Sequence, residues 1–311
     1  MIRIIADSTC DLSQGVIDQY HIGIAPLTIN IEGKVYRDRI DITANEYYKF
    51  IEDLDEHPTT AMPSPTEYLK LFEESINENY DSILCICMSS GTSGAYQSAV
   101  IAKDLFYEEN PESELKIHVV DSLSMSHGSG WLVLKSCRML AHGATFEDLI
   151  DFNESYKMYV KHFLSVDDLD HLIKSGRLTN ASAFIGKILK IKPIMTMKKS
   201  KGAIVAKIRG RKKVLQHYVT EFSKRVDLNV TDFIILGYTS DINYAENLKH
   251  KILKETEYNG DIFIMQMGVA VGTHVGLGAV SMFFIEKGDR PDGFIMNKFN
   301  QLMDHKEKIT Q

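Results

Sequence analysis

Residues 82–94 read SILCICMSSGTSG, so an apolar run passes directly into a small, polar turn that contains two glycines. An apolar run of this length, closed by turn residues, is typical of a strand buried on both faces of a parallel sheet. A helix that starts at the end of such a turn aims its free N–H groups and the positive end of its dipole beyond the strand. This stretch therefore predicts a strand, a turn and a helix start that suit a carboxylate or a phosphate.

The same pattern repeats outward through the first half of the chain. Short apolar strands are expected at residues 2–6, 24–31, 82–88 and 117–120. Recognisable helix starts lie between them, at Thr43 with Glu46 and at Ser64 with Pro65 and Glu67. Another helix is expected at residues 128–142, ended by Gly143. Alternating strands and helices predict a Rossmann-like parallel sheet with helices on both faces.

Polar residues follow three of these strands. They are Asp7-Ser8-Thr9, residues 89–94 and Asp121-Ser122. Ligands of open parallel sheets bind outside the carboxyl ends of the strands. We therefore expect these polar residues to converge at one edge of the sheet.

The second half of the chain has a different pattern, which predicts a mixed sheet with helices. Strands are expected at residues 163–166, 194–197, 203–208, 233–236, 262–266 and 280–285, and helices at residues 180–189, 212–226 and 243–257, with a weaker helical pattern from residue 294. The second and third of these strands would pair through a turn at residues 200–202. After the first strand, Ser165 and Asp168 would form the capping box of a helix that Gly176 ends.

The change of pattern places a domain boundary within residues 152–161. A chain of 311 residues is long enough for two domains of ordinary size. We expect an N-terminal parallel α/β domain at residues 1–155, and a C-terminal mixed α/β domain with a charged tail at residues 156–311.

Composition excludes several classes of protein. The content of 44% apolar and 25% charged residues is that of a soluble globular chain, and a net charge of -7 offers no basic surface for nucleic acid. No run approaches the roughly 18 apolar residues of a membrane helix, and the N-terminus reads as a strand rather than a signal sequence, so we expect a cytoplasmic protein. The cysteines form no Cys-x-x-Cys pair and are expected to be reduced and structural: Cys10, Cys85, Cys87 and Cys137.

Three polar loops are expected, at residues 59–65, 89–94 and 268–278. They carry hydroxyls and open backbone amides but only one ionisable side chain, His274. Such loops suit the binding of a small anionic head group better than acid/base chemistry. This pattern indicates a binding protein.

Each candidate residue in these loops has an alternative interpretation. Ser93 is a helix cap, an anion contact or a nucleophile, although the G-x-S-x-G elbow would need glycine where the chain has Ala95. Thr60 is a solvated turn residue or a hydroxyl presented by a loop that two prolines stiffen. His274 stands among glycines, and it is structural or contacts an anion.

Other residues have a more ordinary interpretation. Arg177 and Arg209 are typical of solvated surface, with a phosphate or partner site as the alternative. No metal site is expected, because His274 has no neighbouring Cys or His and the acidic residues 167–171 are typical of a solvated helix.

Eight methionines are more typical of core filler than of pocket lining, although flexible thioethers would suit an apolar tunnel: Met62, Met125, Met158, Met195, Met197, Met265, Met267 and Met282.

Six motifs, in order, resemble the DegV family of bacterial fatty-acid-binding proteins. They are ADSTCDL at residues 6–12, Thr60 with PSP at 63–65, SSGTSGAYQSA at 89–99, SGRL at 175–178, KPI at 192–194 and GTHVG at 272–276. The resemblance covers about residues 2–284. It implies a two-domain fold with a long-chain fatty acid buried at or near the interface of the domains, and no cofactor.

The resemblance also implies roles for individual residues. The fatty-acid carboxylate would be held by Thr60 and Ser93 with His274 nearby, and further head-group contacts would come from Ser122, Gly94 and Thr273. The protein would carry the lipid for a separate ATP-dependent fatty acid kinase that makes acyl phosphate for phospholipid synthesis, with Arg177 and Arg209 facing the phosphate or the kinase. Ala61, Met62 and Leu277 depart from the residues usual in the family.

Two alternatives stay open at this point. One is a stand-alone serine hydrolase or acyltransferase that uses Ser93 and His274, and the other is a protein that only senses lipid. An activated ester separates the first from a binding protein, since only an enzyme would release product or become acylated at Ser93. The chain contains neither the G-x-S-x-G elbow nor an ATP-binding loop.

Overall fold

The computed structural model describes residues 1–167, 169–179 and 191–288. Its first sheet has four parallel strands in the order β2-β1-β6-β7. They are β1 (Ile2–Asp7), β2 (Gly23–Ala25), β6 (Ser82–Cys87) and β7 (Lys116–Asp121). The predicted Rossmann-like parallel sheet is confirmed.

Helices cover both faces of this sheet. Successive residues of β6 point to opposite faces, with Leu84 and Ile86 in one apolar core and Cys85 and Cys87 in another. The first core is closed by α1 (Gln14–Tyr20), α5 (His127–Ala141) and α6 (Phe146–Tyr156), and the second by α3 (Pro65–Asn77) and α4 (Ala95–Glu109). All four cysteines are buried and free, as expected.

The helix starts and stops that the sequence predicts are largely present. The capping box of Thr43 and Glu46 opens α2 (Ala44–Tyr47), and the hydroxyl of Ser64 accepts a hydrogen bond from the backbone N–H of Glu67 at the start of α3. Gly143, with φ of 91°, follows the end of α5. This is a left-handed conformation that glycine adopts without strain.

One predicted strand is wrong, because residues 24–31 divide between two sheets. Pro26 lacks an N–H, and the N–H of Leu27 donates to the hydroxyl of Ser8 (3.1 Å), so β2 ends at Ala25. The chain then forms β3 (Thr28–Ile31), which pairs antiparallel with β4 (Lys34–Arg37) and β5 (Thr59–Ala61). Thr60 therefore lies on a strand, and not in the loop that the sequence predicts.

The second sheet is mixed, as predicted, and has seven strands in the order β13-β12-β14-β8-β10-β11-β9. Among the described strands of this sheet, only β12 with β13 and β11 with β9 are parallel pairs. The strands are β8 (Val160–Ser165), β9 (Leu178–Thr179), β10 (Ile191–Lys198), β11 (Lys201–Arg209), β12 (Phe233–Tyr238), β13 (Asp261–Gln266) and β14 (Val280–Ile285). The turn between β10 and β11 is Lys199-Ser200, one residue earlier than predicted, and both residues have positive φ.

The predicted capping box after β8 is wrong. Ser165 belongs to β8, and α7 (Asp170–Lys174) has Leu169 at its N-cap position, although Gly176 follows the helix with φ of 70° as predicted. Asp168, the predicted helix at residues 180–189 and the helical pattern from residue 294 lie outside the described residues.

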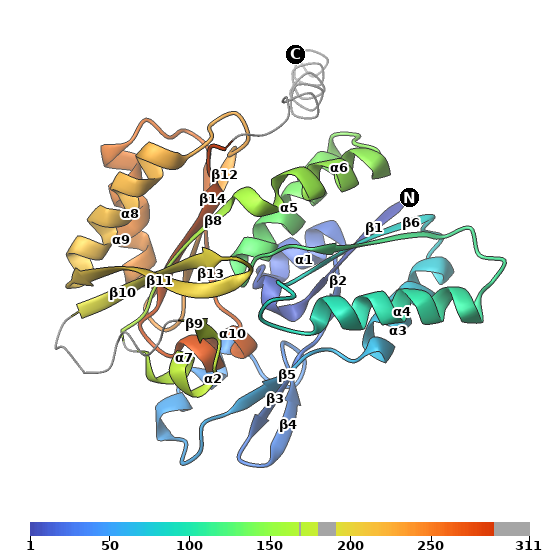
Figure 1. Ribbon diagram of the computed structural model, residues 1–311, viewed down its shortest axis with the longest axis horizontal. Coiled ribbons are helices and arrows are strands. Elements are labelled where there is room, and N and C mark those ends of the chain that lie inside the picture. Colours follow the sequence, from blue (N-terminus) through green and yellow to red (C-terminus); the bar gives the residue numbers. More distant parts are fainter. Residues whose placement is uncertain (168, 180–190, 289–311) are drawn as a thin grey trace.

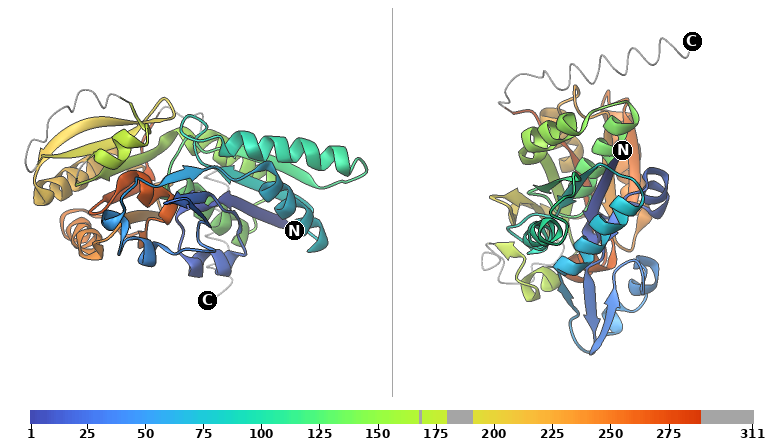
Figure 2. Two further views of the ribbon diagram at one scale, coloured as in Figure 1. Left: turned by 90° about the horizontal axis from the view of Figure 1, so that it is seen from below. Right: turned by 90° about the vertical axis from the view of Figure 1, so that its right-hand side faces the viewer.

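Helix α5 lies between the two sheets. It contacts β1 and β6 of the first sheet and β8, β12 and β14 of the second, which explains why its residues are buried on nearly all sides. On the far face of the second sheet lie α8 (Arg211–Arg225) and α9 (Ile242–Glu255). Figures 1 and 2 show the two sheets side by side, with α8 and α9 at the outer end. Helix α5 packs on both sheets, so its contacts do not assign it to one domain. A domain boundary within residues 152–161 therefore stays a prediction.

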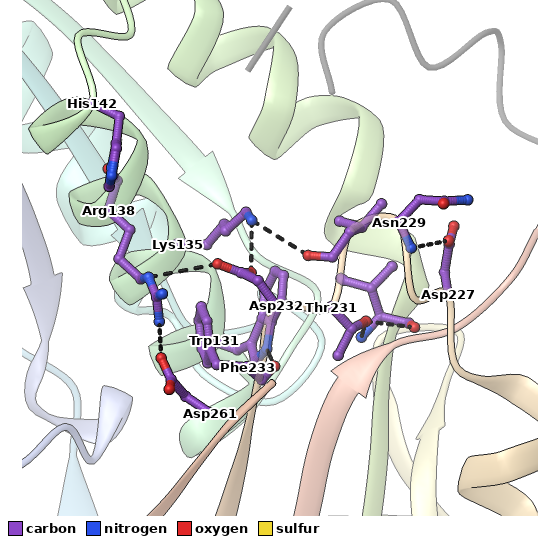
Figure 3. A network of polar contacts seen from close by, with 12 residues as sticks. Trp131, Lys135, Arg138, His142, Asp227, Asn229, Thr231, Asp232, Phe233 and Asp261 are labelled. Carbon is purple, nitrogen blue, oxygen red and sulfur yellow. Dashed lines mark hydrogen bonds and ion pairs between the residues drawn. The ribbon is translucent and has the colours of Figure 1, made fainter. Parts of the chain in front are cut away.

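A polar network fixes the C-terminal end of α5 to the second sheet (Figure 3). The ammonium of Lys135, 1% exposed, donates to Asp232 (2.7 Å) and to the carbonyl of Val230 (3.3 Å). Arg138 pairs with Asp232 and Asp261 on either side. The indole N–H of Trp131 donates to the backbone of Phe233, whose ring stacks on the indole. The two sheets are thus joined firmly at one end of α5, while the other end reaches the site described below.

Among the described helices, none combines the length and the apolar character that a membrane crossing requires.

Candidate functional site

Polar groups converge at the carboxyl ends of the parallel strands, as the sequence predicts. The carboxylate of Asp7, at the end of β1, accepts a hydrogen bond from the N–H of Met88 (2.7 Å) after β6. The carboxylate of Asp121, at the end of β7, accepts one from the N–H of Ser90 (3.1 Å). These bonds hold the turn at residues 89–94 in place in front of α4.

The tip of the β10–β11 hairpin packs on this turn. The hydroxyl of Ser89 donates to the carbonyl oxygen of Ser200 (2.8 Å). A Cβ atom at Gly91 would lie 2.3 Å from the same oxygen, so only glycine fits there. The hairpin thereby closes one side of a space between the two sheets.

That space is a cavity of about 960 Å³, counting the part open to solvent. Both halves of the chain contribute to it. The N-terminal half supplies Thr9, Leu27, Thr60, Met62, Met88, Thr92, Ser93, Met125 and Ser126, and the C-terminal half supplies mainly apolar side chains of α7, β8, β10 and α10 (Val269–Val275).

Methionines dominate the apolar wall. Met62, Met125, Met195, Met197 and Met267 line the cavity together with Met88. Met195 and Met267 are also buried in an apolar core cluster, so the prediction of core filler is wrong only for Met62, Met125 and Met197 among them, while Met265 and Met282 lie in the core and Met158 is exposed. Unbranched thioethers adapt their shape to a flexible apolar ligand.

The three main predicted residues line this one cavity, and two of them are in contact. The hydroxyl of Thr60 on β5 lies 2.8 Å from Nε2 of His274, and Ser93 lines the same cavity. The Ser93 hydroxyl accepts a hydrogen bond from the N–H of Ala95 (3.3 Å), but the N-cap of α4 is Gly94, so Ser93 is not the helix cap. Two hydroxyls and an imidazole thus face the ligand space.

His274 is carried by α10, where the sequence predicts a glycine-rich loop. The helix begins at Gly268, whose N–H donates to the buried carboxyl of Asp11 (2.8 Å). A Cβ atom at Gly272 would lie 2.3 Å from the hydroxyl of Tyr48, which itself donates to the carbonyl of Met267 (2.9 Å). Gly272 therefore allows α10 to pack closely on Tyr48 at the end of α2, and the predicted loop is wrong for residues 269–275 but not for residues 276–278.

The imidazole of His274 is neutral at pH 7. Burial, together with repulsion from Arg177, His57 and His171, lowers its pKa to about 4. A neutral imidazole keeps one N–H and one acceptor nitrogen. Nε2 faces Thr60, and Nδ1 is buried without a hydrogen-bond partner among the described residues.

No role is assigned from the sequence to two buried carboxyl groups, those of Asp11 and Asp38. Asp11 accepts a hydrogen bond from Ser126 (2.5 Å) and Asp38 accepts one from Ser8 (2.8 Å). Burial raises the pKa of Asp11 to about 8 and that of Asp38 to about 6. No local signal marks Asp38, whereas Asp11 stands in the motif at residues 6–12.

The remaining predicted head-group residues are not among those that line the cavity. The hydroxyl of Ser122 bonds to the backbone of Ser124. Thr273 is fully buried, with its hydroxyl 3.0 Å from that of Tyr47. Gly94 lies under Met62, since a Cβ atom there would be 2.2 Å from the sulfur. Their contact with a head group stays a prediction.

Of the two predicted arginines, only Arg177 is near the site. It is exposed, lines the cavity, and also borders a smaller polar pocket formed with Thr92 and Lys201. Arg209 is exposed at the end of β11, away from both pockets.

The acidic stretch at residues 167–171 makes ion pairs. Asp167 pairs with Arg211 (2.7 Å) and Lys192 (2.8 Å). In the part of the chain that the structure describes, no group of three potential metal-ligating side chains gathers.

The arrangement differs from that of a serine hydrolase. A serine nucleophile needs its base within hydrogen-bond reach, and the base needs an orienting partner. Here Nε2 of His274 bonds to Thr60, while Ser93 accepts from the backbone. The site offers neutral hydrogen-bonding groups in a largely apolar space.

Comparison with known proteins gives matches that cover nearly the whole described chain. The family model described as "Uncharacterised protein, DegV family" matches residues 1–287. A DegV domain-containing protein of Clostridium acetobutylicum is 36% identical over 286 residues, covering 92% of this chain and 99% of that protein.

Two solved structures are closely similar. One is a DegV family protein from Thermus thermophilus, described as binding fatty acid, with 27% identity, a TM-score of 0.81, and coverage of 92% of this chain and 99% of that chain. The other is a stearic acid-binding protein from Eubacterium ventriosum, with the same values.

Proposed function

This chain belongs to the DegV family, and we propose that it binds a long-chain fatty acid in the cavity between its two sheets. The acyl tail would lie against the methionines, and the carboxylate would lie at Thr60, Ser93 and His274. The observation that supports the proposal is the Thr60–His274 pair, 2.8 Å apart, in a methionine-lined cavity that Ser93 also lines. Fatty acids are also what the similar proteins of Thermus thermophilus and Eubacterium ventriosum bind.

Tail and head would have separate roles. Burial of a hydrocarbon chain contributes about 0.8 kcal/mol per methylene group, so the tail would supply most of the affinity. A carboxylate left without hydrogen bonds in an apolar cavity would be costly, and hydroxyl donors lower that cost without cancelling the charge. The head would therefore orient the ligand.

We further propose that the bound carboxylate is presented to a separate ATP-dependent fatty acid kinase, in the cytoplasm, for conversion to acyl phosphate. A carboxylate held by hydroxyls and a neutral imidazole remains a better nucleophile than one paired with arginine. Arg177 is suited to the transferred phosphate or to the kinase, because it is exposed at the rim beside Thr92 and Lys201. A contact of Arg209 with the kinase would lie farther from the head group.

Two measurements test the proposal in sequence. Native mass spectrometry of freshly purified protein, before and after organic extraction, should show the mass of a fatty acid in the first spectrum and its loss in the second. With the cognate kinase and ATP, trapping of acyl phosphate by hydroxylamine should fall strongly for His274→Ala and Ser93→Ala. Wild-type turnover by both variants would remove these residues from the proposed site.

An activated ester separates a binding protein from a hydrolase. Incubation of the protein alone with p-nitrophenyl palmitate should release no nitrophenol beyond the buffer rate. Sustained release that Ser93→Ala abolishes would replace the proposed binding function with catalysis.

A further inference from the structure

The second sheet is split between β8 and β10. The two strands pair only at Ile194 with Ser165 and at Met195 with Leu164, although both are fully described. On their other sides, β8 pairs with β14 and β10 pairs with β11 along the whole length of each strand. The β10–β11 ladder shifts register at the same level, between Ile194 and Met195, where Val205 of β11 has no partner on β10. The facing edges therefore diverge beyond Leu164 and Met195.

Two spaces meet at this split. On one face, His162 and Met197 line the main cavity. On the other face, Phe163 and Lys198 line a groove of about 740 Å³, counting the part open to solvent, beside α8. This is the alternation of side chains expected along two strands. Thr196, 6% exposed, lines both spaces.

The outer groove has the chemistry of an exit for a hydrocarbon chain. Its floor is apolar, formed by Phe163, Val205 and Ala206. Its rim carries Lys161 and Arg225, which both pair with Glu286, and also Lys198. Long basic side chains cover apolar surface with their methylene stems and keep the charge in water. A chain end emerging here would find apolar contact first and polar groups next.

We propose that the main cavity continues past Thr196 into this groove, so that the protein accepts fatty acids longer than the cavity can enclose. This rests on the proposed function, with the carboxylate at Thr60 and Ser93. A cavity closed at its far end would reject a chain one or two methylenes too long, because inserting extra methylenes into a filled space is destabilising. A cavity open at the split sets no such limit, and the end of the tail lies against Phe163.

The test plugs the split. Dissociation constants are measured for palmitic, stearic, behenic and lignoceric acids, by competition with a bound fluorescent fatty acid. The proteins are the wild type, Thr196→Phe, and Thr220→Phe as a control with the same substitution at an exposed position of α8. Wild type and control should bind the two longest acids as tightly as stearic acid, within about threefold. Relative to its affinity for palmitic acid, Thr196→Phe should lose about tenfold or more for the longest acids.

A measurement on the wild type alone guards against a misfolded variant. A very long fatty acid with a fluorophore at its ω-end should be quenched by iodide when bound, while a short labelled acid should be shielded. A sharp loss of affinity beyond one chain length in the wild type, or shielding of the long labelled acid, overturns the opening and leaves the proposed function standing. Absence of palmitic acid binding by the wild type overturns the proposed function, and the opening with it.

Discussion

Replacing Thr60 by valine should weaken the binding of a long-chain fatty acid. The hydroxyl of Thr60 lies 2.8 Å from Nε2 of His274, in the cavity that both residues line. In the proposed complex it donates to the carboxylate, and a hydrogen bond to a charged group contributes about 1.5–3 kcal/mol. Thr60→Val should therefore raise the dissociation constant for palmitic acid about tenfold to a hundredfold.

Isothermal titration calorimetry with two ligands checks the origin of this loss. Methyl palmitate carries the same tail with a neutral head, and a neutral hydrogen bond contributes only about 0.5–1.5 kcal/mol. The substitution should therefore cost the ester less than the acid. Thr59→Val is the matched control, since Thr59 neighbours Thr60 on β5 and is exposed.

Two results would refute this reasoning. One is an equal loss for the acid and the ester after Thr60→Val, which would show that the hydroxyl does not respond to charge. The other is a similar loss of acid binding in Thr59→Val, which would assign the effect to β5 as a whole.

Three further predictions concern stability. In urea unfolding, Asp232→Ala should lower the free energy of unfolding by about 3 kcal/mol, because the buried ammonium of Lys135 loses its carboxylate partner. Lys135→Met removes the buried charge itself and should cost under about 1 kcal/mol. Equal costs would contradict the role of the buried charge. Burial lowers the pKa of His162 from 6.5 to about 3, so between these values the unfolded chain binds a proton that the folded chain does not, and the free energy of unfolding falls as the pH drops. Between about pH 7 and 4, His162→Leu should therefore lose about 3 kcal/mol less of this free energy than the wild type. Identical pH profiles of the two proteins would exclude this group. Gly91→Ala should cost about 1–3 kcal/mol in thermal unfolding, because its Cβ would meet a backbone oxygen of the β10–β11 hairpin, whereas Gly15→Ala, with open space around it, should not destabilise.

The sequence predicts the parallel sheet and the turn at residues 89–94 well, because these depend on local patterns. Residues 82–88 carry an unbroken apolar run, and the strand ends in the polar turn that the structure shows. Helix ends with a cap or a left-handed glycine, such as Gly143 and Gly176, are local signals of the same kind. The predicted convergence of polar residues then follows from the rule for open parallel sheets.

The errors arise where distant contacts override local patterns. The segment around Thr60 forms a strand because Ile29 pairs with it across β3 and β5. Residues 269–275 form α10 because Asp11 binds the N–H of Gly268 and Tyr48 packs on Gly272. The wall of methionines could not be told from core filler, because both environments favour the same side chain and only the assembled sheets create the space between them.

A crystal structure of the protein with palmitic acid tests the central claim most directly. We predict one carboxylate oxygen within hydrogen-bonding distance of the Thr60 and Ser93 hydroxyls, and an acyl tail running along Met125 and Met195 between the two sheets. A carboxylate located elsewhere, with the tail outside the space between the sheets, would contradict this account.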